Sequence, residues 1–285
     1  MRSIKIIGLM IVTFFLLVPV LVRGEFNTID ELERTYGDKA CKTCHEKTHA
    51  EWQKSLHAQS VVHSLGGVRN FIVFGLKRDW KKPVNRENLM RCMHCHAPLL
   101  EHASDSLAAE IGELVVSAFD GNEGAKKQLA RLNVNCVVCH NTVAEVEINL
   151  RGATRPGVYY GPSGRPTTAH GTEKSKSITS SAFCSRCHWL YTPPDRDTLY
   201  CNTLYDSYQD AYKAAGGAAT CQDCHMRAKE RGHTFPGAYV PEMVKEGIGI
   251  DLQATGVRVQ PGTGVPAAII TIGLFNNAGH RIPDG

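Results

Sequence analysis

The chain has 285 residues and a nearly balanced charge, with 32 Lys and Arg against 28 Asp and Glu and a formal net charge of +4. Three of the basic residues lie in the first 24 positions, and without them the net charge is about +1. Such a chain lacks the basic excess that favours binding to nucleic acid, so we expect no nucleic-acid partner.

The N-terminal segment has the three parts of a secretory signal peptide. Arg2 and Lys5 form a basic start, residues 6–22 are an unbroken apolar run, and Val22 and Gly24 are small residues at a plausible cleavage point. A run of 17 residues is also the lower limit for a membrane span, so a retained anchor is the alternative. We predict cleavage after residue 24 and a periplasmic or extracellular location, with membrane attachment only if the segment is retained.

One five-residue pattern, Cys-x-x-Cys-His, occurs five times. The copies begin at residues 41, 92, 136, 184 and 221 and contain ten of the eleven cysteines. Export favours disulfides, but a disulfide framework needs no histidine after each pair, and five such copies would be odd for zinc ribbons. Cys-x-x-Cys-His is the attachment site of c-type haem, where both thiols form thioethers and the histidine binds iron. We therefore predict five covalently attached haem c groups.

The motifs assign the attachment residues and the first axial ligands directly. The predicted attachment residues are Cys41, Cys44, Cys92, Cys95, Cys136, Cys139, Cys184, Cys187, Cys221 and Cys224. The predicted first axial ligands are His45, His96, His140, His188 and His225. Each haem also carries two propionates, so the loaded protein should be acidic. The remaining cysteine, Cys201, is expected to be a partly buried thiol.

The segments between the motifs mainly predict helices. The expected helices are residues 45–67, ending at Gly66–Gly67; residues 106–119; residues 125–132; and residues 201–215, ending at Gly216–Gly217. Residues 151–170 are rich in Gly and Pro and predict a loop. Near the C-terminus, residues 247–260 and 267–276 predict two strands separated by Pro-Gly-Thr-Gly.

Removal of a 24-residue signal would leave 261 of the 285 residues, or about 52 for each motif. This leaves little side-chain material for an independent core, so we expect five covalent haems to form the core and the apo-protein to be largely unfolded. The predicted fold class is mainly α with extensive loops. Its expected parts are a signal peptide at 1–24, a pentahaem cytochrome c domain at 25–245 and the start of a small C-terminal β-domain at 246–285. The alternative is that the two strands simply pack on the haem domain.

Five irons need up to five further axial ligands, and eight histidines lie outside the ends of the motifs. The candidates that we favour are His57, His170 and His233, followed by His63 and His280. If residues 45–67 form one continuous helix, His63 lies roughly 27 Å from His45 along its axis and cannot bind the same iron. A full set of ligands would make every site bis-His.

Several short sequence segments at and around the motifs resemble those of a known family. They are EWQKSLHA (51–58), CMHCHAP (92–98), NVNCVVCH (133–140), AFCSRCH (182–188), CQDCHM (221–226), HTFPG (233–237) and NAGHRIPDG (277–285). With them the chain resembles the multihaem c-type cytochromes related to the tetrahaem cytochrome of ammonia oxidisers, a superfamily that includes hydroxylamine oxidoreductase. The resemblance implies a fold of helices and loops with stacked or perpendicular haem pairs. It also implies distal ligation by His57 and His233 and a C-terminal β-domain that continues.

Two functions from different classes remain after the motifs are assigned. An electron carrier needs closely spaced haems with closed, bis-His iron, whereas a redox enzyme acting on a small nitrogen or sulfur oxyanion needs one haem with an open distal face. Every motif here ends in His, whereas the pentahaem nitrite reductases replace one of these histidines with lysine. We favour the carrier over the enzyme, with redox proteins or other multihaem cytochromes as partners. A third possibility is a structural version of the carrier, in which the subunits polymerise through exposed haems.

Overall fold

The computed structural model describes residues 25–141, 157–189, 203–258, 262 and 266–282. The predicted signal peptide, Cys201 and the first part of the predicted loop lie outside these ranges. The described chain is mainly helical, as expected, with one parallel and one antiparallel two-stranded sheet. None of the helices in these ranges is both long and apolar enough to cross a membrane.

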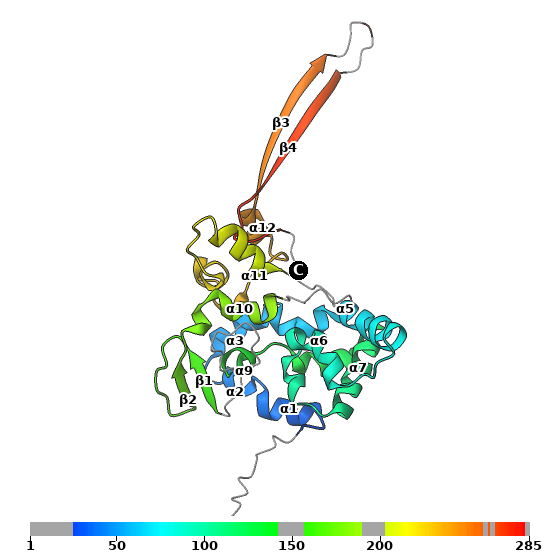
Figure 1. The fold of residues 1–285 in the computed structure, drawn as a ribbon. Helices are drawn as coiled ribbons and strands as arrows, with labels where there is room; N and C mark the ends of the chain where they lie inside the picture. The colour runs from blue at the N-terminus through cyan, green and yellow to red at the C-terminus, as the bar shows by residue number, and fades with distance from the viewer. Residues whose placement is uncertain (1–24, 142–156, 190–202, 259–261, 263–265, 283–285) are drawn as a thin grey trace, which may run out of the picture.

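The first half of the chain forms a helical body (Figure 1). Its α-helices are α1 (Ile29–Tyr36), α2 (Lys39–Lys42), α3 (Glu46–Gln53), α4 (Ser60–His63), α5 (Leu65–Asn70), α6 (Arg86–His96), α7 (Asp105–Phe119), α8 (Glu123–Leu129) and α9 (Cys136–His140). Its 3-10 helices are η1 (His57–Gln59), η3 (Pro98–His102) and η4 (Ala130–Leu132), and η2 (Phe71–Asp79) is a π-helix.

This body has a hydrophobic core of side chains. Leu32 of α1, Ile72 of η2, Leu89 of α6 and Ile111 of α7 are all fully buried in one cluster that extends from Ile29 to Val137. The helices between the motifs bury apolar stripes against one another, which lowers the free energy of the folded state without any cofactor. The expectation of little side-chain material for an independent core is therefore wrong for the first half of the chain.

Helix α7 illustrates why these segments are helical. Ser104 caps its N-terminus, with Oγ accepting a hydrogen bond from the Leu107 N–H at 3.3 Å. Leu107, Ile111 and Val115 then recur every four residues on the buried face. Gly112 allows close approach of a neighbouring segment, because a Cβ there would stand 2.5 Å from Val84 Cγ1. The predicted helix at 106–119 is confirmed.

The predicted helix at 45–67 is wrong as a continuous element. α3 ends at Gln53, and the chain then passes through η1 into α4. Asn133 stabilises this break, since its Oδ1 accepts the Val61 N–H at 3.0 Å and its side-chain amide donates to the Ala58 carbonyl at 2.5 Å. Nor do the two glycines end the helical region, because α5 includes both of them, with Gly66 close to Phe119 of α7. Packing has overridden the low helix propensity of glycine.

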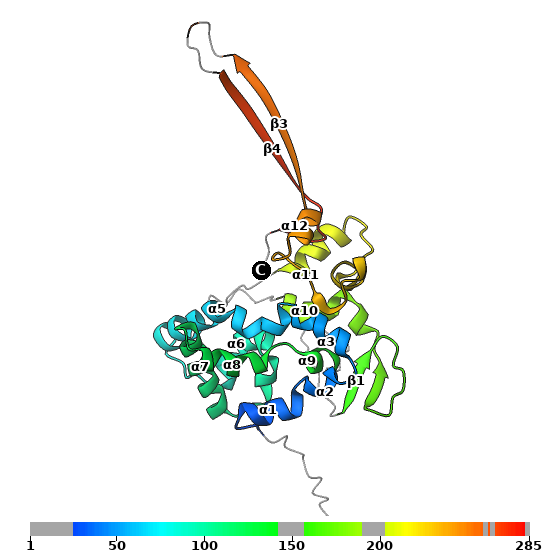
Figure 2. The same ribbon diagram turned by 180° about the vertical axis from the view of Figure 1, so that it is seen from behind.

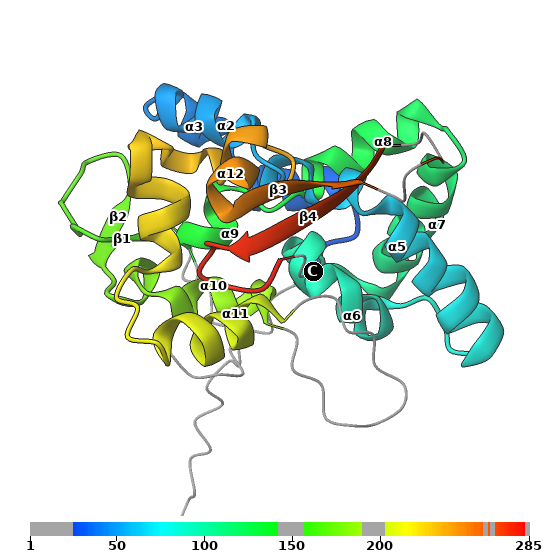
Figure 3. The same ribbon diagram turned by 90° about the horizontal axis from the view of Figure 1, so that it is seen from above.

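The second half of the chain packs beside this body. It contains β1 (Val158–Gly161), β2 (Gly171–Lys174), η5 (Ser177–Thr179), α10 (Ser181–His188), α11 (Leu204–Ser207), η6 (Tyr208–Lys213), η7 (Asp223–Arg227), η8 (Ala228–Glu230) and η9 (Gly232–Thr234). Figures 1, 2 and 3 place β1 and β2 on one side of the molecule and α7 on the other. The predicted loop at 151–170 is wrong at β1, which pairs in parallel with β2 from Val158 opposite Gly171. In its described part, the predicted helix at 201–215 is present as α11 and η6.

A long hairpin projects from the body beyond α12 (Pro241–Gly247) (Figures 1 and 2). Its strands β3 (Ile248–Arg258) and β4 (Pro266–Asn276) confirm the two predicted strands and pair in antiparallel register. Successive side chains of a strand alternate between faces, and the register therefore places Leu252 and Ile272 on the same face. Leu252 is 64% exposed and Ile272 is 61% exposed. One face of the hairpin thus presents apolar side chains that no described element covers.

Candidate metal centres

The five motifs define sites 1 to 5, numbered in chain order, and each lies on a helical turn. The second motif ends α6, the third forms α9 and the fourth ends α10, while the fifth runs into η7. In the first motif, the His45 N–H donates to the Cys41 carbonyl at 2.9 Å, which is also a helical turn. Because residues i, i+3 and i+4 share one face of a helix, both thiols and the histidine of each motif can reach one ligand.

Four motif histidines each face a second histidine from elsewhere in the chain. The ring centroids are 6.4 Å apart for His45 and His170, 6.1 Å for His188 and His57, 6.2 Å for His140 and His233, and 6.3 Å for His225 and His280. Each pair therefore joins one motif histidine to one histidine outside the motifs. Four of the five candidate distal ligands are placed opposite a motif histidine in this way.

This spacing fits two imidazoles bound to one iron. A metal–nitrogen bond is about 2.0 Å long and a ring centroid lies about 1.1 Å beyond its nitrogen, so two such ligands place their centroids about 6.2 Å apart. The four observed separations lie between 6.1 and 6.4 Å. In the described ranges no group of three or more His, Cys, Asp or Glu side chains is arranged to hold a metal ion. The repeated unit is the histidine pair beside a pair of thiols.

Backbone carbonyls fix the orientation of several of these rings. The Nδ1 atoms of three motif histidines donate to carbonyls: His96 to Ser60 at 3.1 Å, His140 to Tyr160 at 2.8 Å and His225 to Pro236 at 2.8 Å. Two non-motif histidines do the same, His170 to Gly171 at 3.1 Å and His280 to Arg281 at 2.8 Å. A carbonyl only accepts, so Nδ1 must carry the hydrogen and Nε2 keeps the lone pair that a metal needs.

The small β1–β2 sheet serves two sites at once. His170 directly precedes β2 and lies edge-on to Tyr159 of β1, with centroids 4.9 Å apart. The next residue of β1, Tyr160, provides the carbonyl that holds His140. Asn141 donates to the Val158 carbonyl at 2.6 Å and ties the third motif to the same strand. The sheet therefore orients the second histidine of site 1 and the motif histidine of site 3.

Burial keeps the histidines of site 4 neutral. Burial, and after it the charge on His188, lowers the pKa of His57 to about 4. Burial also lowers the pKa of His188, with smaller contributions from neighbouring histidines. Because the charged form is disfavoured, both rings are neutral at pH 7, which is the form of imidazole that binds metals.

Thiols from different motifs touch one another. A hydrogen bond with Cys136 lowers the pKa of Cys41 to about 7, and a hydrogen bond with Cys184 lowers the pKa of Cys221 to about 6. The Cys95 thiol lies 3.6 Å from the Cys187 carbonyl. Site 1 is therefore adjacent to site 3, site 2 to site 4, and site 4 to site 5.

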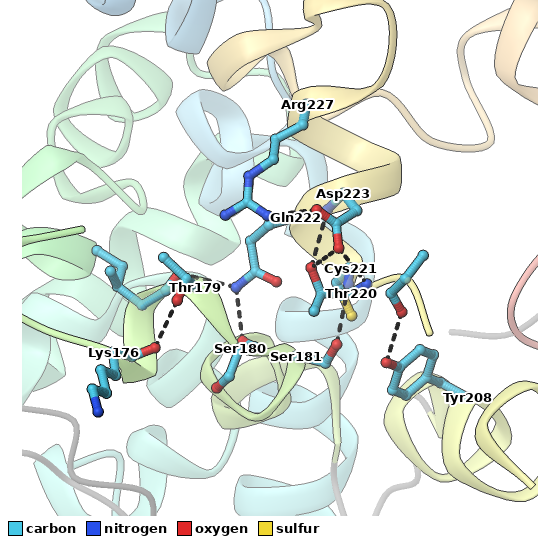
Figure 4. Close-up of polar contacts among 12 residues, drawn as sticks. Lys176, Thr179, Ser180, Ser181, Tyr208, Thr220, Cys221, Gln222, Asp223 and Arg227 are labelled. Atoms are coloured by element: carbon cyan, nitrogen blue, oxygen red, sulfur yellow. Dashed lines mark hydrogen bonds and ion pairs between the residues drawn. The ribbon is translucent and has the colours of Figure 1, made fainter. Parts of the chain in front are cut away.

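Polar contacts hold the fourth and fifth motifs together (Figure 4). Gln222 is buried, and its amide donates to the carbonyls of Ile178 at 3.0 Å and Ser180 at 2.7 Å. The Ser181 hydroxyl, at the start of α10, accepts the Cys221 N–H at 3.1 Å. These bonds connect the segment that leads into site 4 with the first residues of site 5, and they fix the relative position of the two motifs.

The remaining histidines have other neighbours. His63 lies edge-on to Tyr239, with centroids 5.0 Å apart, rather than opposite a motif histidine. His49 Nε2 pairs with Asp38 Oδ2 at 2.6 Å, and His102 stacks on Tyr36 at 4.5 Å. Within the described part of the chain, His96 is the motif histidine that no histidine ring faces at the common spacing.

Sequence reasoning missed the residues that support the ligands. Ser60, whose carbonyl accepts a hydrogen bond from His96 Nδ1, lies outside the Cys-x-x-Cys-His motifs. So does Asn133, whose side chain accepts the Val61 N–H. Glu51 contacts the backbone of His233 across a long separation in sequence. For Gly232 a signal was available, because a glycine directly before a candidate ligand often indicates a close approach of another group.

A comparison with known protein families agrees with sites built from Cys-x-x-Cys-His motifs. The family model described as "Cytochrome c554 and c-prime" matches residues 40–141, a range that contains the first three motifs. No curated protein and no solved structure matches the chain. The match and the motifs together support a multihaem c-type cytochrome with covalently bound haem and a role in electron transfer.

Proposed function

We propose that the chain carries five haem c groups and passes electrons along them. The ten motif cysteines would attach the haems, and the motif histidines would bind the irons from one side. Opposite them, His170, His57, His233 and His280 would complete sites 1, 4, 3 and 5. The observation that carries this proposal is that four histidine pairs share a spacing that fits one iron between them.

The contacts between motifs support a continuous path. Site 1 touches site 3 through Cys41 and Cys136, and site 4 touches site 5 through Cys184 and Cys221. Sites 3 and 4 are also close, since the Cys187 thiol of the fourth motif lies near enough to Cys139 of the third to interact with it electrostatically. The proposed order is site 1, site 3, site 4 and site 5, with site 2 beside site 4. Electron tunnelling falls steeply with distance, so adjacency of this kind determines the route.

Each bound haem would supply an iron that changes between the ferric and ferrous states. The protein residues that hold the paired imidazoles would keep both ligands in place when the charge of the iron changes. Carbonyl groups such as those of Tyr160 and Pro236 orient the rings, and the lowered pKa values of His57 and His188 keep both imidazoles of site 4 neutral. A fixed, closed ligand set suits transfer of electrons better than chemistry on a substrate.

One observation favours a second function at site 2. His96 is held by Ser60, but among the described residues no histidine ring lies opposite it. An iron bound there by one histidine would keep an open position for a small nitrogen or sulfur oxyanion, as in a multihaem oxidoreductase. We rank this below the carrier function, since four of the five sites have paired histidines.

The test is low-temperature EPR of the oxidised, haem-loaded protein, together with a haem count by mass spectrometry. Five haems with low-spin signals from at least four irons support the carrier. A count of fewer than five, or several high-spin irons, would contradict the ligation scheme. One high-spin signal that changes on addition of nitrite, hydroxylamine or sulfite would identify site 2 as reactive and favour the enzyme. Export, and redox proteins as partners, remain proposals that rest on the N-terminal sequence and the class.

A further inference from the structure

Glu51 makes a contact with His233 that none of the other paired histidines has. Glu51 lies on α3, the helix that follows the first motif, while His233 lies on η9. The carboxylate Oε2 of Glu51 accepts the backbone N–H of His233 at 3.0 Å and lies 4.0 Å from its Nδ1. A single carboxylate thus contacts the main chain of this histidine and lies near its ring.

The chain around His233 is shaped to receive this carboxylate. Gly232 has a φ of +57°, a left-handed conformation that glycine adopts without strain. A Cβ at this position would overlap the Glu51 carboxylate. Only glycine therefore lets Glu51 approach the η9 backbone this closely.

The ring of His233 also differs from those of His170 and His280 in how it is held. Those two donate their Nδ1 hydrogen to a backbone carbonyl of the following residue. In the described structure no carbonyl holds the His233 Nδ1, and the charged group near it is Glu51, whose side chain is 21% exposed. Phe235 packs edge-on against this ring, with centroids 5.6 Å apart.

We propose that Glu51 is a positioning residue that holds His233 opposite His140 and makes the iron of site 3 harder to reduce. This inference rests on the proposed function, since it takes His233 to be a ligand. At 4.0 Å from Nδ1 the carboxylate makes no hydrogen bond with the ring, so it holds His233 through the backbone N–H and acts on the ring through its charge. The negative charge also favours the ferric state, in which the iron has one more positive charge.

The first test replaces Glu51 with Gln and titrates the haem-loaded protein, following each iron by EPR. The amide oxygen of Glu51→Gln can still accept the His233 N–H, so the fold is retained while the charge is lost. We expect all low-spin signals to remain and the potential of one haem to rise, with the others unchanged. Glu51→Asp, which keeps the charge, should restore part of the shift. Glu110→Gln is the matched control, because it removes the same charge from an exposed position on α7 and should leave every potential unchanged.

A second pair of variants separates the role of His233 as a ligand from the role of Glu51 as a positioning residue. His233→Ala should convert one low-spin haem to high spin and thereby identify the signal of site 3. Gly232→Ala should displace Glu51 and weaken the same signal. If His233→Ala leaves every low-spin signal in place, the ligation itself is wrong. If His233→Ala acts as expected but Glu51→Gln shifts no potential, or shifts one other than that of site 3, the role of Glu51 is refuted and the proposed function stands.

Discussion

The ring of His57 lies 6.1 Å from that of His188 at an angle of 71°, although the two residues come from opposite halves of the chain. His57 begins η1, in the break that interrupts the first long helical region, and His188 ends α10. A continuous helix through residues 45–67 would not contain this turn. The interruption therefore has a structural consequence, because it directs one histidine toward the fourth motif.

Replacement of His57 should open site 4. We expect His57→Ala to turn one of the low-spin irons into a high-spin iron, since no other described histidine faces His188. EPR and visible absorption of the oxidised protein measure this change. His63→Ala is the comparison, because His63 packs on Tyr239 and should leave all low-spin signals intact. Loss of a low-spin signal in His63→Ala, with none in His57→Ala, would reverse the assignment.

Acid should weaken the junction between α1 and η4. The hydrogen bond from Arg131 lowers the pKa of Asp30, and for Glu33 the bonds from Lys39 and Arg131 outweigh the effect of burial, so its pKa is also lowered. A carboxylate with a lowered folded-state pKa stabilises the fold above its unfolded-state pKa, and this contribution is lost as the pH falls through the folded-state value. The junction should thus contribute fully near neutral pH and fade below about pH 4.

The variant Arg131→Gln tests this junction. We expect it to lower the free energy of unfolding at pH 7 only slightly, because ion pairs of this exposed kind are weak. The difference from the wild type should be smaller at pH 3 than at pH 7, because pH 3 lies below the ordinary pKa of both carboxyls and the stabilisation declines below that value. Melting temperatures at the two pH values measure it. A difference that is equal at both would show that Arg131 acts through packing and not through its charge.

The local part of each site could be read from the sequence. Cys-x-x-Cys-His places its three functional groups on one helical turn, and α7 follows from a serine cap and apolar residues at helical spacing. Pairing of the histidines could not be read in the same way. His140 and His233 meet because α3 packs on η9 and β1 packs beside α9, and such contacts depend on the whole fold.

Other differences have the same origin. The strand at Val158–Gly161 lies within a Gly- and Pro-rich segment, but Val158, Tyr159 and Tyr160 themselves favour strands, and β2 provides the pairing partner. α5 continues through Gly66 and Gly67 because the helix packs against α7, where Leu65 and Val68 are buried. In α5 the tertiary contact overrides the low helix propensity of glycine, whereas in β1 the pairing with β2 completes a strand that the local residues favour.

Gln222 should be needed for the junction between sites 4 and 5. In Gln222→Ala, the carbonyls of Ile178 and Ser180 would lose their donor, at a cost of about 1–2 kcal/mol. We expect a lower melting temperature and a smaller fraction of protein with a full haem complement, measured by mass spectrometry. Gln222→Glu should behave similarly, because an ionised carboxylate cannot donate.

The control for this junction is Thr179→Ala. Thr179 lies in the same segment, and its hydroxyl donates to the Lys176 carbonyl at 2.8 Å on the exposed side (Figure 4). Its removal should leave both the melting temperature and the haem content close to those of the wild type. An equal loss in the two variants would mean that the whole segment is merely sensitive to substitution.

The exposed face of the hairpin should make the 285-residue chain self-associate. Ile250, Leu252, Ile272 and Leu274 all lie on this face and are 61–70% exposed. Burial of apolar surface is favourable, and a large exposed apolar patch commonly marks a site of association. We expect Leu252→Asp to reduce both the concentration-dependent increase in size, measured by analytical ultracentrifugation, and the binding of a hydrophobic dye.

Thr271→Asp is the matched control for the hairpin, because Thr271 pairs with Gln253 on the opposite, more polar face. It adds the same charge one residue from Ile272 and should leave association and dye binding unchanged. Equal reduction in both variants would indicate that added charge alone prevents association, independent of the face. Absence of association in the wild type at all concentrations, with strong dye binding, would mean that the face is exposed but does not bind itself.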